Sequence, residues 1–353
     1  MFRNLHYYGR YVCSVLMLSL PLLAAAQNKS DLVIVWDANR ANQLKVSGHI
    51  IEYTNVALSI KLPSGGVRQI ESDRIVTMVT AWRPEYQEAE VLFHEKQYDR
   101  AEKGFRQAYT VETRAWIKER IQARILWCLR AQGEWSAAAR FYTEVLRKTN
   151  PATPYIDVIP IVWHTLILSP AMQGQAVALL DSPDLNDRLI GASWLLASPL
   201  RARAVSTLTQ LELNTNTRIA ILATAQLWRT KLPVALKADL EKWQNVINRL
   251  PLVYQAGPYY VLGQLQQQQG ESALAVLTWM RVVILHPHGH QLNAESLLAA
   301  IKALRQLEKP TQAITLCREL QNEYQSTIAA TQTSRLIKQL QQLQLDLKAD
   351  SEK

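Results

Sequence analysis

Apolar and polar residues alternate in two different periods, and the change of period divides the chain in two. Between residues 31 and 80, short runs rich in Val, Ile and Thr alternate with polar residues and are separated by turn-forming pairs such as Gly65-Gly66. A period of two is that of a strand with one buried face. Five strands are therefore predicted, DLVIVW, LKVSGHIIEYT, VALSIKL, GVRQIES and IVTMVT. From Pro84 onward apolar residues recur every three or four positions, which predicts helices.

Within the helical part, a small residue is followed by larger apolar residues at intervals of four and three. The clearest copy lies in the stretch 256–287, where Gly263 and Gly270 precede the three apolar positions and Pro287 follows them. Glycine allows a close helix crossing or a left-handed turn, and proline stops a helix. The spacing occurs at Ala101, Phe105 and Ala108; at Ala138, Tyr142 and Val145; at Ala275, Trp279 and Val282; and at Ala313, Cys317 and Leu320.

This order of residues resembles the tetratricopeptide repeat, a pair of antiparallel helices. Trp243, Val246 and Pro251 also stand 36 residues before Trp279, Val282 and Pro287, close to the period of that family. The resemblance implies a right-handed α-solenoid, which is a binding scaffold rather than a catalyst. The fold class we expect is mainly α, an α-α superhelix preceded by a small antiparallel β domain.

The middle of the helical part keeps the helical period but loses this spacing. Three Ser-Pro pairs, at 169–170, 182–183 and 198–199, each precede an apolar run, which predicts helices with Ser at the N-cap and Pro at the first position. These short helices resemble HEAT-type stacking. The β segment resembles small SH3-like or Sm-like barrels. The boundaries we expect are a signal segment at 1–26, a β domain at 27–80, repeats at 84–151, divergent helices at 152–230, repeats at 231–325 and a capping helix with a tail at 326–353.

The first 26 residues are typical of a secretory signal peptide. Arg3 and Arg10 precede the apolar run 11–26, which ends in Ala24, Ala25 and Ala26. This run is shorter than the roughly 20 residues of a membrane-spanning helix. We expect cleavage after Ala26 and a periplasmic or envelope location, with an uncleaved N-terminal anchor as the alternative.

The chain is basic, with a formal net charge of +9. Such a charge favours anionic partners, either acidic peptides or envelope surfaces. The basic residues are spread along the chain, which is also the pattern of solvated helix faces. Export argues against nucleic acid as the partner.

The sequence contains few arrangements that carry catalytic chemistry. It has no phosphate-binding P-loop, no Gly-x-Ser-x-Gly elbow and no paired-cysteine zinc motif. His94 and Glu95 begin a zinc-protease motif, but Tyr98 stands where the second histidine belongs. We expect no enzyme activity and no cofactor. His286, His288 and His290 are weak metal candidates, because Pro287 and Gly289 between them fit a simple turn after a helix.

In the tetratricopeptide family, the first helix of each repeat lines a concave groove that binds a peptide. The resemblance therefore implies groove positions at Tyr86, Glu90, Phe93, Trp127, Arg130, Tyr260, Gln264, Lys302 and Arg305. This mixture of aromatic and basic residues would suit an extended acidic peptide. The expected function is a non-catalytic scaffold or adaptor of the bacterial envelope. The alternative is an envelope module whose β domain recognises a glycan or an anionic polymer.

Overall fold

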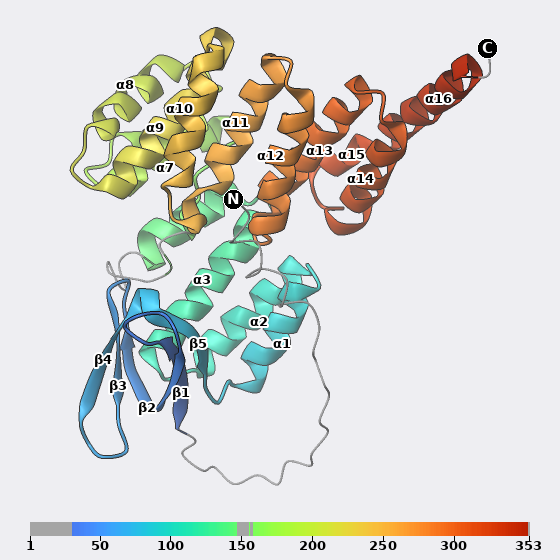
Figure 1. Ribbon diagram of the computed structural model, residues 1–353. Helices are drawn as coiled ribbons and strands as arrows, with labels where there is room; N and C mark the ends of the chain where they lie inside the picture. The colour runs from blue at the N-terminus through green and yellow to red at the C-terminus, as the bar shows by residue number, and fades with distance from the viewer. Residues whose placement is uncertain (1–29, 147–154, 156–157, 352–353) are drawn as a thin grey trace.

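The protein is mainly helical, with a small five-stranded antiparallel sheet near its N-terminus (Figure 1). The computed structural model describes residues 30–146, 155 and 158–351. The predicted class, mainly α with a preceding antiparallel β unit, is confirmed at this level. The predicted signal segment lies outside the described residues.

The sheet has the strand order β4-β3-β2-β1-β5. Its members are β1 (Asp31–Trp36), β2 (Gln43–Tyr53), β3 (Ala57–Lys61), β4 (Val67–Glu71) and β5 (Ile75–Val79). Alternate residues point to one face, as the period of two predicts, so that Leu58 on β3 pairs with Ile70 on β4 and both are buried. At Gly48 a Cβ would lie 2.2 Å from the carbonyl oxygen of Lys61, so β2 and β3 could not approach as they do with a larger residue.

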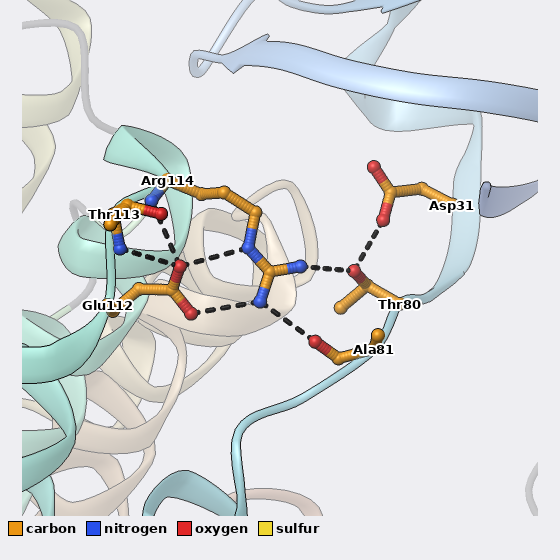
Figure 2. Close-up of polar contacts among 6 residues, drawn as sticks. All are labelled: Asp31, Thr80, Ala81, Glu112, Thr113 and Arg114. Carbon is orange, nitrogen blue, oxygen red and sulfur yellow. Dashed lines mark hydrogen bonds and ion pairs between the residues drawn. The ribbon is translucent and has the colours of Figure 1, made fainter. Parts of the chain in front are cut away.

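A partly buried ion pair joins the sheet to the helices (Figure 2). Arg114 donates two hydrogen bonds of 2.9 Å to the carboxylate of Glu112, which is only 3% exposed. The same guanidinium donates at 2.8 Å to the Thr80 hydroxyl and at 2.8 Å to the Ala81 carbonyl, just after β5. The Thr80 hydroxyl in turn donates to Asp31 at the start of β1. The sheet is therefore held on the helical body by a chain of polar contacts.

The helices pack in chain order and form two arms (Figure 1). The first arm, which carries the sheet, consists of α1 (Pro84–His94), α2 (Tyr98–Val111), α3 (Ala115–Ala131) and α4 (Trp135–Phe141), which runs into a π-helical turn at Tyr142–Leu146. The second arm consists of α6 (Pro170–Leu180), α7 (Leu185–Leu195), α8 (Arg201–Glu212), α9 (Thr217–Lys231), α10 (Lys237–Asn248), α11 (Ala256–Gln268), α12 (Ser272–Leu285), α13 (His290–Gln306), α14 (Pro310–Glu323), α15 (Ile328–Thr331) and α16 (Thr333–Ser351).

Four of the helical hairpins share one turn geometry. In each, a residue with positive φ stands two positions before the second helix, at Lys96, Gly133, Gly270 and Glu308. Its amide donates to the carbonyl three residues back, and the next amide donates to the carbonyl five residues back. This is the pattern of the Schellman cap. The alanine five residues after the positive-φ position is fully buried in all four hairpins, at Ala101, Ala138, Ala275 and Ala313.

Two of the three predicted Ser-Pro caps are wrong. Ser169 does cap α6, where its hydroxyl accepts a hydrogen bond from the Met172 amide. At α7 the N-cap is Asp184, which accepts from two backbone amides. Ser198 lies before α8 without capping it, because its hydroxyl accepts from Leu200, the residue at the N-cap position. Carboxylates cap as well as hydroxyls, so the competing Asp184 decides the start of α7.

The two arms touch again far along the sequence. The Lys96 ammonium pairs with Glu323 at the end of α14 and lies 4.7 Å from the ring centroid of Tyr324. Nearby, the Gln291 amide on α13 donates at 2.7 Å to the carbonyl of Ala131 at the end of α3. The first hairpin, formed by α1 and α2, and the end of α3 are thus in contact with the α13–α14 hairpin. Among the described helices, none combines the length and apolarity needed to cross a membrane.

Candidate binding pocket between the arms

The irregular segment at residues 158–164 belongs to neither a helix of the two arms nor a sheet. Its backbone is bound by side chains from the second arm. Gln226 and Arg229 of α9 donate to the carbonyl of Val162 at 3.0 and 2.9 Å, and Arg229 also donates to the carbonyl of His164 at 3.1 Å. A buried chain without a strand partner needs such donors. They fix the positions of Trp163 and His164.

Gly257 at the start of α11 makes room for the Trp163 indole. A Cβ at position 257 would lie 1.9 Å from the Trp163 ring, so only glycine lets that ring lie on the helix. On the other side, the ring of His164 lies 5.8 Å from that of Trp135 on α4. The segment therefore presents an indole and an imidazole to the space between the arms.

That space is a pocket of about 210 Å³ bounded by both arms, which we call the inter-arm pocket. Its walls are formed by α3 and α4, the irregular segment 158–164, α9, the start of α11 and the turn between α12 and α13. The aromatic and imidazole side chains that line it are Trp127, Trp135, Trp163, Tyr254, His164, His286, His288 and His290. Among the described residues that line it, Arg130 is the charged one, and none is acidic.

Two histidines that line the pocket, His164 and His286, have lowered pKa values that favour the neutral form. Burial lowers the pKa of His164 to about 4, with a further contribution from the charge of Arg229. Burial also lowers the pKa of His286 to about 4. The Nδ1 atom of His164 and the Nε2 atom of His286 are buried and have no hydrogen-bond partner in the described protein. A neutral imidazole nitrogen either donates or accepts a hydrogen bond, so each of these two atoms has a hydrogen-bonding capacity that no described protein group uses.

The candidate metal residues His286, His288 and His290 do not converge. The ring of His288 lies 5.6 Å from Phe93 and 5.8 Å from Trp127. His290, at the start of α13, packs 4.9 Å from the ring of Tyr98. Within the described ranges, no group of three or more His, Cys, Asp or Glu side chains is placed to hold a metal ion. The three imidazoles instead lie in the turn between α12 and α13 and at its contact with the first arm.

Two of the groove positions, Tyr86 and Glu90, lie in one hydrogen-bonded network between α1 and α3. Tyr86 donates to Glu90 one turn later on α1. From α3, Arg120 donates to the Tyr86 hydroxyl at 2.7 Å and Arg124 donates to Glu90 at 2.8 Å. Burial acts to raise the pKa of Glu90, but Arg124 and the Tyr86 hydroxyl outweigh it and lower that pKa. Tyr86 and Glu90 are therefore committed to partners within the protein.

The other groove positions do not form one continuous surface. Trp127 and Arg130 line the inter-arm pocket, and the guanidinium carbon of Arg130 lies 4.3 Å from the Trp127 ring centroid. Tyr260 is buried on α11, with Gln264 half-buried one turn further on. Lys302 is exposed on α13, and so is Arg305, which donates at 2.9 Å to Gln339 of α16. The structure thus brings Phe93, Trp127 and Arg130 together near His288, in the turn between α12 and α13. Lys302 and Arg305 of α13 do not line the pocket.

Sequence reasoning missed Trp135, Trp163, His164 and Tyr254 as site residues. The count of ten tryptophans was the available signal, but no spacing marked which of them would meet. The comparisons with known proteins add no assignment. No protein-family model matches the chain, and no curated protein sequence matches it significantly.

Proposed function

We propose that the protein is a non-catalytic interaction scaffold of the tetratricopeptide-like kind, which binds a protein or peptide partner. The observation that carries this proposal is the common turn of four hairpins, with a positive φ two residues before each second helix and a buried alanine five residues after it. Repetition of one supersecondary unit is the basis of solenoid scaffolds. The inter-arm pocket, with Trp127 and Arg130 in its wall, is the surface hollow that we assign to the partner.

We assign the β domain the role of a cap on the first hairpin rather than of a separate ligand module. The support for this is the Glu112–Arg114 pair, which ties the end of β5 to the start of α3. A domain held by several polar contacts to one arginine is suited to a fixed structural position.

The test is a pull-down from envelope extract with the full chain as bait. We expect a protein partner to be recovered, and Trp127→Ala to reduce its recovery. Charge reversal at Lys302 and Arg305 tests whether the basic face of α13 extends the binding surface. If these changes have no effect and an internal deletion of 27–80 abolishes binding while the helical part still folds, the β-domain alternative is correct and the scaffold proposal is wrong.

We also propose export with removal of the first 26 residues. The N-terminal sequence of the protein purified from its native envelope is expected to begin at Gln27. Recovery of the intact N-terminus in the membrane fraction would instead support the anchor alternative.

A further inference from the structure

We propose that the inter-arm pocket binds one planar aromatic group that carries a single hydrogen-bonding polar atom, as an indole or a phenol does. This inference rests on the proposed function, because it names the chemistry that a partner would insert. The same chemistry could reach the pocket as a side chain of a partner or as a free small molecule.

The size of the pocket sets the scale of the ligand. A cavity of roughly 150 Å³ in a protein core can hold one benzene molecule. The inter-arm pocket, at about 210 Å³, has room for a phenol or a bicyclic ring but not for an extended peptide segment. The ligand is therefore a single group rather than a stretch of chain.

The walls of the pocket favour an aromatic group. Trp127, Trp135 and Trp163 line it from three different elements. Aromatic rings gain energy from offset or edge contacts with one another beyond the area that they bury. The remaining wall is largely aliphatic and would exclude water from the faces of a planar ligand.

Two unpaired ring nitrogens on residues that line the pocket favour one hydrogen-bonding atom on that ligand. His164 Nδ1 and His286 Nε2 are buried without a protein partner, and a buried polar atom left unpaired is costly. An indole N–H or a phenol O–H can satisfy one of them, which a pure hydrocarbon cannot do.

The charges around the pocket disfavour a cationic ligand. Arg229 lies behind His164, where it donates only to backbone carbonyls and Gln226 in the described contacts. Within the described lining there is no carboxylate to neutralise an ammonium group. An amine attached to the same ring is therefore a matched negative probe.

The experiment is isothermal titration of the full chain with indole, with p-cresol and with benzylammonium. For ligands of about ten heavy atoms we expect a Kd on the order of 0.1–1 mM for the first two. Benzylammonium is expected to bind at least about tenfold more weakly, because a buried unpaired charge is disfavoured. Equal binding of all three probes would overturn the proposal.

Two variants connect this binding to the pocket. Val253 lines the pocket but is 52% exposed, which places it at the rim, so Val253→Trp should narrow the entrance without disturbing the core. Leu213→Trp, at a residue that is 83% exposed and does not line the pocket, is its control. We expect Val253→Trp to weaken indole binding and the control to leave it unchanged. His286→Phe removes one polar partner and should weaken indole by roughly fivefold, as the loss of one hydrogen bond does.

A capped Ala-Trp-Ala peptide separates the two sources of the ligand. If it binds about as well as indole, the pocket accepts a partner's side chain; if indole alone binds, the ligand is a free small molecule. No heat with indole or p-cresol, or the same Kd in Val253→Trp and in the control, would overturn the inference. A partner recovered in the pull-down without any indole binding would leave the scaffold function standing and refute only this inference.

Discussion

Trp279 on α12 lies directly over Gly263 on α11. A Cβ at position 263 would lie 2.5 Å from the indole Nε1, and that nitrogen donates a hydrogen bond of 3.1 Å to the carbonyl oxygen of Tyr260. The glycine therefore sets the distance between the two helices of this hairpin. The indole both fills the contact and is fixed in orientation by its polar edge.

Gly263→Ala is expected to destabilise the protein by about 1–3 kcal/mol, because the added methyl forces the buried indole to move. The measurement is the urea midpoint of unfolding. Gly174→Ala is the matched control, since position 174 lies in α6 and a Cβ there would meet nothing within 4 Å. It should stabilise by about 0.5–1 kcal/mol through helix propensity. Equal effects of the two changes would show that the α11–α12 contact can relax.

Glu308→Gly is expected to stabilise the α13–α14 hairpin by about 1 kcal/mol. Glu308 has a φ of 55°, in the left-handed region that costs a residue with a side chain but not glycine. Gly270→Ala makes the opposite change at the equivalent position of α11–α12, where φ is 79°, and should destabilise by a similar amount. Thermal melting of both variants checks the pair. A lower melting temperature for Glu308→Gly would contradict the equivalence of the two turns.

Arg114→Met is expected to destabilise the protein by about 3 kcal/mol, because it leaves the buried Glu112 carboxylate without its cation. Adding Glu112→Gln should recover much of the loss, which denaturation of the single and double variants would reveal. Burial acts to raise the pKa of Glu112, but the hydrogen bonds and charge of Arg114 lower it overall. The pair therefore stabilises the fold above the pKa of the unfolded carboxyl, and this contribution is lost as the pH falls. Additive losses in the double variant would refute the coupling.

Acidification from pH 7 to pH 5 is expected to lower the free energy of unfolding through His290. Burial, followed by the charge of Lys96, lowers its pKa to about 4, whereas the unfolded residue titrates near about 6.5. Between these values the unfolded chain binds a proton that the folded protein excludes, so stability falls with pH by on the order of 1–2 kcal/mol at pH 5.

His290→Gln should flatten this dependence while leaving that of the other histidines. The urea midpoints of both proteins at pH 7, 6 and 5 measure the difference. Parallel curves would mean that His290 remains accessible to protons in the fold.

The local features of the fold could be predicted from the sequence, and the pocket could not. Strand and helix periods follow from burial of one face, and the spacing of Ala275 and Trp279 reports a helix crossing that needs small and large partners. The positive φ at Lys96 and Glu308 could not be predicted from the residue type, because neither residue is glycine. The Schellman hydrogen bonds hold both residues in this conformation. The predicted repeat frame places Val246 of α10 at the buried position that Val282 occupies in α12. Val246 is only half-buried, and its neighbour Ile247 is the fully buried residue.

The pocket depends on contacts between segments more than a hundred residues apart. Trp127, Trp163 and His286 line one pocket because the α12–α13 turn lies near the end of α3, which no local spacing encodes. The predicted groove positions depend on the first helices of successive repeats lining one open surface. The His288 turn instead lies against Phe93 and Trp127.

The pairing of Lys96 with Glu323 spans 227 positions of sequence. In a linear array, each repeat depends only on its neighbours, so that folding can start anywhere and the ends can fray independently. Here the α1–α2 hairpin and α14 contact each other, so unfolding of one of them removes contacts that stabilise the other. Closing so long a loop has an entropic barrier that the local hairpins do not share. Refolding is therefore expected to show rapid helix formation, followed by a slower phase in which the two arms dock.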